Sequence, residues 1–219
     1  MMIKTSEKLS HKTKLSIFLI IIVSILSFSP GGFSLIPNTG STGKRNPYFT
    51  SPNASKLAFI SQVTNGNPEQ VTGIWLPNLT GLAVEEQPAG KSGFVSDQPD
   101  KVTHFQLAAD FGSIGLLAHS YLAGAFFNDL ELDQTIIIIY GDSSTDKYKI
   151  TEIRQYQALD PDNALTDFSS IEGGGKKISQ EDLFYEIYNH PGRLILQTCI
   201  LFNNDNIWGR KFIIATKVE

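Results

Sequence analysis

Residues 193–216, RLILQTCILFNNDNIWGRKFIIAT, contain two short apolar runs that indicate the fold class of the chain. Runs of this length predict strands over Arg193–Thr198 and Lys211–Thr216. Further strands are predicted upstream, at Lys56–Val63, Gly73–Leu76, Ile114–Ala118, Thr135–Tyr140 and Lys147–Gln157. The run TIIIIY at 135–140 is β-branched and apolar enough to be buried on both faces.

Two helices are expected between the strands, at Leu122–Leu130 and Ser179–Asn189. Ser179 is the predicted N-cap of the second helix, with Asp182 three residues further on. Residues 159–178 read as a polar, glycine-rich loop. A mainly β chain with short helices in its connections is expected to close as a barrel or a sandwich.

Composition excludes several classes of function. The chain has 219 residues and a formal charge of −4. Lysines outnumber acidic side chains in the segment 1–34, so the remainder of the chain is more acidic than the whole. A domain of that charge has no electrostatic footprint for nucleic acid. Because Cys199 is the sole cysteine, the chain has neither an intrachain disulfide nor a zinc site built on two of its own thiolates.

The N-terminus has the pattern of a targeting segment. Polar, lysine-rich residues 1–14 precede the apolar run LSIFLIIIVSILSF at 15–28. This order predicts that residues 1–34 are a signal peptide, cleaved before Leu35, or an N-terminal membrane anchor with the rest of the chain outside the cytoplasm. Residues 35–54 are rich in Gly, Pro, Ser and Asn and predict a flexible linker. Residues 55–219 are then the folded domain.

Three side chains in this domain suggest chemistry. Cys199 follows one predicted strand, His119 follows another, and Arg210 opens the last. A thiol becomes a useful nucleophile when a histidine exchanges a proton with it and a fixed positive charge stabilises the oxyanion. Each residue also has a structural interpretation, as a small core side chain, a hydrogen-bonded histidine and a surface ion pair.

The order of these residues resembles the sortase family. Ile195-Leu196-Gln197-Thr198-Cys199 is similar to the sortase signature T-L-x-T-C. In that family a histidine at a strand end lies well upstream of the cysteine, and an arginine lies on the strand that follows it. Here His119 ends a predicted strand far upstream of Cys199, and Arg210 opens the predicted strand that comes after it.

The resemblance implies a mainly β fold, a sortase-like closed β-barrel of about eight strands, with no cofactor and no metal. It implies a cysteine transpeptidase in which Cys199 attacks an LPxTG-type sorting motif and forms a thioacyl enzyme. His119 then serves as acid and base, Arg210 holds substrate and oxyanion, and Thr198 contributes to substrate binding. The implied partners are surface proteins with a sorting motif and an amine acceptor in the cell envelope. The protein is expected to be an extracytoplasmic monomer, attached to the membrane by its N-terminal segment or secreted.

Two other functions remain open. Water in place of an amine would resolve the thioacyl group, which makes the protein a cysteine peptidase. Alternatively, the domain keeps the fold and binds a partner without catalysis.

Overall fold

The fold is organised around the hairpin of β9 (Arg193–Phe202) and β10 (Asp205–Val218). Its turn consists of Asn203 and Asn204, both with positive φ, 48° and 65°. Asparagine tolerates this conformation better than other non-glycine residues, and two such residues in sequence match the twist of an antiparallel pair. Both strands are longer than the sequence predicts. The cysteine therefore lies within β9, not beyond its end.

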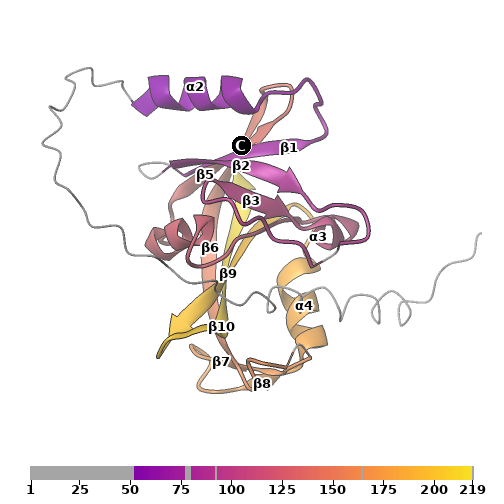
Figure 1. Ribbon diagram of the computed structural model, residues 1–219, viewed down its shortest axis with the longest axis vertical. Coiled ribbons are helices and arrows are strands. Elements are labelled where there is room, and N and C mark those ends of the chain that lie inside the picture. Colours follow the sequence, from indigo (N-terminus) through magenta and orange to yellow (C-terminus); the bar gives the residue numbers. More distant parts are fainter. Residues whose placement is uncertain (1–51, 77–79, 92, 164, 219) are drawn as a thin grey trace, which may run out of the picture.

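The remaining strands close the sheet into a ring, as the computed structural model shows over residues 52–76, 80–91, 93–163 and 165–218 (Figure 1). The order β9-β4-β3-β2-β1-β5-β6-β10 returns to its start because β10 also pairs with β6. The added strands are β1 (Val71–Leu76), β2 (Thr80–Glu86), β3 (Lys101–His104), β4 (Ile114–Leu117), β5 (Thr135–Tyr140) and β6 (Thr145–Ala158). This confirms the closed eight-stranded barrel.

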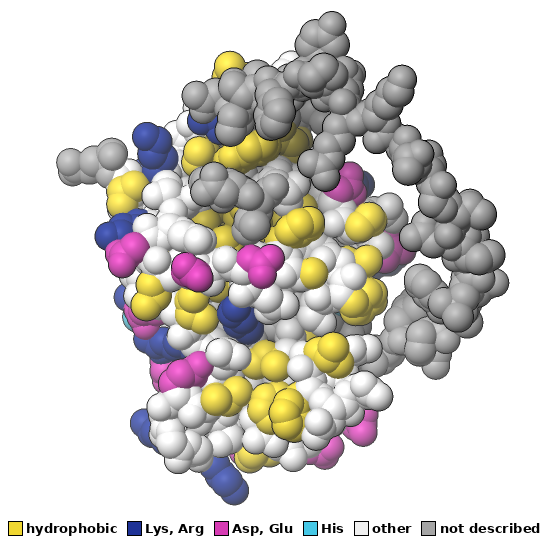
Figure 2. Space-filling view, turned by 90° about the vertical axis from the view of Figure 1, so that its left-hand side faces the viewer, with side chains coloured by type: hydrophobic (Ala, Val, Ile, Leu, Met, Phe, Trp, Pro, Cys, Tyr) yellow, Lys and Arg dark blue, Asp and Glu magenta, His cyan; other side chains and the backbone are white. Residues whose placement is uncertain are grey.

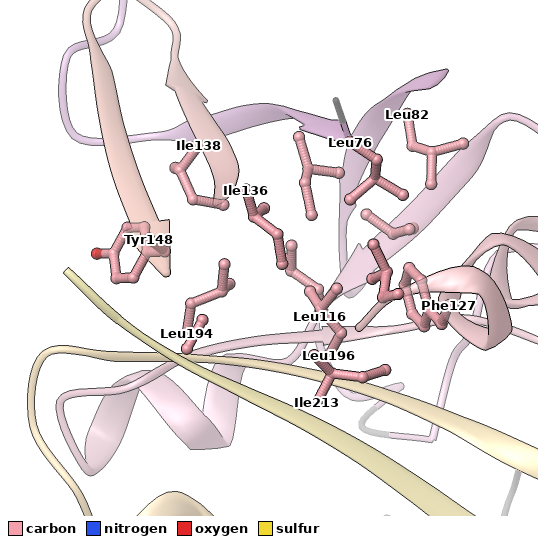
Figure 3. Close-up of a cluster of buried hydrophobic side chains, with 14 of the residues drawn as sticks. Leu76, Leu82, Leu116, Phe127, Ile136, Ile138, Tyr148, Leu194, Leu196 and Ile213 are labelled. Atoms are coloured by element: carbon pink, nitrogen blue, oxygen red, sulfur yellow. The ribbon is translucent and has the colours of Figure 1, made fainter. Parts of the chain in front are cut away.

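The barrel interior is filled by alternate residues of the ring strands. Leu194 and Leu196 of β9 lie in one buried cluster with Ile213 and Ala215 of β10. Figure 3 shows Leu194, Leu196 and Ile213 meeting side chains from β1, β2, β4 and β5, with Phe127 at one side. The intervening residues of β9 and β10 therefore point outward.

A second apolar cluster covers the outer face of the hairpin. There α4 (Gln180–Tyr188) contributes Leu183, Phe184 and Ile187, which pack with Ile195 of β9 and Phe212 of β10. Burial on both faces explains why these two strands are continuous apolar runs. The helix lies where the sequence predicts it, and Ser179 is its N-cap, accepting a 3.1 Å hydrogen bond from the backbone nitrogen of Asp182.

Two segments differ from the sequence-based expectations. The predicted strand at Lys56–Val63 is wrong, because these residues belong to helix α2 (Pro52–Val63). Phe59 of this helix lies over Gly81, where an added Cβ would approach its ring to 2.6 Å. The predicted loop at 159–178 contains β7 (Phe168–Ser170) and β8 (Lys177–Ile178), which extend the sheet beyond β6.

Two short helices complete the connections. Helix α3 (Gln106–Asp110) precedes β4, and the 3₁₀ helix η2 (Ala123–Asp129) follows it, within the predicted helix Leu122–Leu130. The predicted signal or anchor segment at 1–34 and positions 35–51 of the predicted linker lie outside the described residues. Among the helices that the structure describes, none has the length and apolar character needed to cross a membrane.

Candidate active site

Cys199 and Arg210 are direct partners across the β9–β10 hairpin. Successive side chains of a strand point to opposite faces of the sheet. Leu196 and Ile213 face the barrel interior, and Cys199 and Arg210 are each three residues away on the same strands. Cys199 and Arg210 therefore belong to the outer face. Both residues are buried, with exposed fractions of 6 % and 3 %. Little of the Cys199 side chain is therefore open to solvent.

His119 reaches the same region through the parallel pairing of β4 with β9. The register of these strands places Leu117 opposite Gln197. One residue further, the backbone nitrogen of Ala118 donates to the Gln197 carbonyl at 3.1 Å. His119 is the next residue after Ala118, and the chain turns there, because the backbone nitrogens of Leu122 and Gly124 bond to its carbonyl. Cys199 and Arg210 are thus paired directly, and His119 follows the strand next to β9. The catalytic role of the three residues remains a prediction.

Thr198 lies between the nucleophile position and the histidine segment. Its side chain is buried on the inner side of β9, and its Oγ1 donates a 2.9 Å hydrogen bond to the Ala118 carbonyl. This bond ties β9 to the residue directly before His119. The predicted role of Thr198 in substrate binding remains a prediction, and the contact that the hydroxyl makes in the structure is with the protein itself.

The turn after His119 is held by close backbone packing. The backbone nitrogens of Leu122 and Gly124 both donate to the His119 carbonyl at 3.0 Å. A Cβ at Gly124 would lie 2.3 Å from Thr198 Oγ1 and 2.7 Å from the His119 carbonyl oxygen. Only glycine fits there, because η2 passes directly over the bond between Thr198 and Ala118.

Burial sets the charge of His119. Desolvation lowers the pKa of its imidazole, while a backbone hydrogen bond with Val95 and the charge of Asp97 act in the opposite direction. The ring also stacks on Tyr121, with centroids 5.3 Å apart and planes at 23°. An imidazole with a pKa below 6.5 is mostly neutral at pH 7, so it is in the form that accepts a proton.

Arg210 is fixed by carbonyls of its own strand. Its Nη1 donates to Gly209 at 2.9 Å and to Ile207 at 3.1 Å. Within the described residues, no group accepts a hydrogen bond from Nε, which is fully buried, and none accepts one from Nη2. The guanidinium is therefore anchored through one nitrogen and retains donors for another molecule.

A groove of about 360 Å³ opens beside the thiol. Cys199, Ile200 and Leu201 of β9 line it, together with Ser120 and Tyr121 after His119. Lys211 of β10 also lines it, and its Nζ donates to the Phe127 carbonyl at 3.1 Å. Figure 2 shows the face that carries η2 and the tip of the hairpin, where hydrophobic and uncharged side chains predominate over charged ones.

Three residues of this region carry no signal that sequence reasoning used. Gly124 has no Cβ, and this lets η2 approach Thr198 closely. Lys211 bonds to the Phe127 carbonyl near the end of η2. Gln180 begins α4, and both polar atoms of its buried amide lack a partner among the described residues. Each of these roles depends on tertiary neighbours that are distant in the chain.

No protein-family model matches the chain, and no curated protein matches it in sequence. Solved structures that are similar to it are sortases. Sortase C1 from Streptococcus suis is 14 % identical, with 82 % of this chain and 89 % of that chain covered and a TM-score of 0.46. Sortase A from Corynebacterium diphtheriae is 15 % identical, with 80 % and 73 % covered and a TM-score of 0.44. Sortase E1 from Streptomyces coelicolor, solved with a tripeptide in its active site, is 18 % identical, with 71 % and 92 % covered and a TM-score of 0.41.

Proposed function

We propose that this protein is a cysteine transpeptidase of the sortase type, which cleaves an LPxTG-type motif and transfers the acyl part to an amine. The observation that carries the proposal is the strand register. Cys199 and Arg210 are direct partners, and His119 lies two residues beyond the last paired residue of β4, the strand next to β9. A binding module has no need for the only thiol of the chain to be paired with an anchored guanidinium and to have a histidine on the segment that follows the adjacent strand.

The first half of the proposed reaction forms a thioester. His119 takes the proton of the Cys199 thiol, and the resulting thiolate attacks the scissile carbonyl carbon. The new C–S bond forms as the carbonyl oxygen becomes an oxyanion, which Arg210 stabilises with its planar donors. The oxyanion then collapses, the C–N bond breaks, and the imidazolium of His119 gives its proton to the leaving amine.

The second half reverses these steps with a new amine. Neutral His119 takes a proton from the incoming amine as its nitrogen attacks the thioester carbonyl. The C–S bond then breaks, and the Cys199 sulfur leaves as a thiolate that recovers its proton from His119. The groove beside Cys199, about 360 Å³ in volume, is the space in which the peptide and the acceptor would bind.

The cellular setting forms part of the proposal. The lysine-rich start and apolar run of residues 1–34 support an extracytoplasmic location, anchored in the membrane or secreted. There the substrates would be surface proteins with a sorting motif, and the acceptor an amine of the cell envelope.

The test is a transfer reaction with the full-length protein in detergent. A labelled LPxTG peptide and triglycine are incubated with the protein, and the products and the intact protein are analysed by mass spectrometry. We expect a peptide–triglycine ligation product and an acyl adduct that is absent in Cys199→Ala. Hydrolysis alone would make the protein a peptidase. No adduct and no product, with a folded protein, would indicate a binding domain and overturn the proposal.

A further inference from the structure

A second, much smaller cavity lies behind the candidate site, between α4 and the outer face of the hairpin. Its volume is about 10 Å³. Gln180, Gln197 and Arg210 contribute its polar lining, while Leu183, Phe184 and Phe212 are among its apolar neighbours. Gln180 is 6 % exposed and Arg210 is 3 % exposed, so both line the cavity as buried polar side chains.

Three polar atoms of these two residues have no hydrogen-bond partner among the residues that the structure describes. Within the described part of the chain, nothing bonds to Nε2 or Oε1 of Gln180 or to Nε of Arg210. A buried donor or acceptor left unsatisfied costs about 1–3 kcal/mol, and native proteins keep few of them. The third polar residue is already engaged, since Gln197 Oε1 accepts a 2.6 Å hydrogen bond from the Tyr188 hydroxyl. Among the polar residues that line this cavity, the atoms without a hydrogen-bond partner in the described structure thus belong to Gln180 and Arg210.

Size and hydrogen-bonding pattern together select the ligand. A cavity of about 10 Å³ is at the lower limit of the volume that one water molecule needs, and it is too small for any larger ligand. The ligand must accept a hydrogen bond from Arg210 Nε, and it must also donate one to Gln180 Oε1. A metal cation does not accept, and a halide does not donate. Water does both.

We propose that one buried water molecule binds in this cavity and joins the Gln180 amide to Arg210 Nε, which makes Gln180 a positioning residue for Arg210. The inference rests on the proposed function for the role of Arg210, although the water site itself does not. Nη1 is held by the carbonyls of Ile207 and Gly209, and the water holds Nε. With two nitrogens fixed, the plane of the guanidinium is set and Nη2 remains for the substrate.

The helix that carries Gln180 is itself well anchored. Ser179 caps it through the 3.1 Å bond from Asp182, and Leu183, Phe184 and Ile187 bury its apolar face. The proposed water thus connects α4, which lies between β6 and β9 in the chain, to the hairpin that carries Cys199. Movement of α4 would loosen Arg210 without touching Cys199.

The water is tested first in the unaltered full-length protein. The Nε–H signal of Arg210, assigned by its loss in Arg210→Lys, is expected to show a magnetisation-transfer peak to a long-lived water. A crystal structure with ordered solvent should place that water within hydrogen-bond distance of both Nε and the Gln180 amide. A direct bond between Gln180 and Arg210, or a dry cavity, overturns the proposal whether or not the protein is a transpeptidase.

The positioning role is tested by kinetics with a matched control. Gln180→Met keeps the length of the side chain and removes its hydrogen bonds, so we expect the water peak to disappear and kcat to fall about tenfold with KM little changed. Gln180→Glu retains an acceptor and should recover most of kcat. Glu181→Met, on the exposed side of the same turn, is the control and should leave both readouts unchanged. Equal kcat in Gln180→Met and Glu181→Met would overturn the role of Gln180.

Discussion

Cys199 and Arg210 lie directly opposite each other on β9 and β10, although the whole hairpin turn separates them in the sequence. A two-residue turn alone would not produce this pair, because the register shifts between Asp205 and Gly209. The irregularity sets which residue of β10 faces the thiol. It also leaves the Ile207 and Gly209 carbonyls at positions where they accept from Arg210 Nη1.

Arg210→Lys should lower kcat/KM by about 100-fold, the loss typical of removing one oxyanion donor. An ammonium is a point charge and lacks the planar fork that bonds two carbonyls and still presents a free nitrogen. The measurement is the rate of peptide ligation under conditions where the variant is folded. Arg193→Lys, which changes a surface ion pair with Glu152, is the matched control and should retain full activity. Equal activity in the two variants would remove Arg210 from the mechanism.

Thr198→Val tests the bond between β9 and the residue before His119. Valine has the shape of threonine but no donor, so the buried Ala118 carbonyl loses its 2.9 Å bond. We expect a loss of about 1–2 kcal/mol in the free energy of unfolding, measured with urea, and a lower ligation rate. Thr198→Ser keeps the hydroxyl and should preserve most of both. If the serine variant is as impaired as the valine variant, the hydroxyl is not the cause.

Gly124→Ala should damage the site by steric overlap. The new methyl group would lie 2.3 Å from Thr198 Oγ1 and close to the His119 carbonyl. Overpacking of this kind costs about 1–3 kcal/mol and shifts the backbone that carries the histidine. Thermal unfolding and ligation rate are the measurements. Ala125→Ser, at the exposed neighbouring position, should behave as the unaltered protein, and a tolerated Gly124→Ala would show that η2 is free to move.

Acid should destabilise the protein partly through His119. Burial lowers the pKa of this imidazole in the folded state, whereas the unfolded chain has the ordinary value of 6.5. Below that pH the unfolded state binds the proton more readily, so the free energy of unfolding falls as pH drops through 6.5 toward the lower folded pKa. Urea unfolding between about pH 7.5 and 5 should show a steeper fall than in His119→Gln. Parallel curves would contradict a buried neutral imidazole.

Local sequence patterns were enough to predict the central strands and the capped helix. Thr135–Tyr140 matches β5 at both ends, and the Ser179 cap is present as predicted. These elements combine strong local preference with burial, so local and tertiary forces agree. The three catalytic candidates came from the resemblance to sortases, and their role stays a prediction. The pairing of Cys199 with Arg210 was not part of it.

The remaining features depend on contacts between distant segments. The sequence predicts a strand at residues 56–63, but these residues belong to a helix. Phe59 of the helix packs against Gly73 and Gly81, and this contact between distant segments cannot be read from the local apolar pattern. Strands β2 and β3 have partly exposed, polar-rich patterns that resemble loops. Gln180 is an ordinary first-turn residue in sequence, and only the cavity beside Arg210 shows why it is buried.

The most direct test of the central claim is alkylation of the full-length protein in detergent, folded and in urea, followed by intact mass across a range of pH. The chain has one cysteine, so every added mass reports on Cys199. A nucleophilic thiol coupled to His119 should react in the folded protein, and its pH profile should change in His119→Ala. Labelling that occurs only in urea, with no effect of His119, would identify Cys199 as a structural core residue and contradict the account.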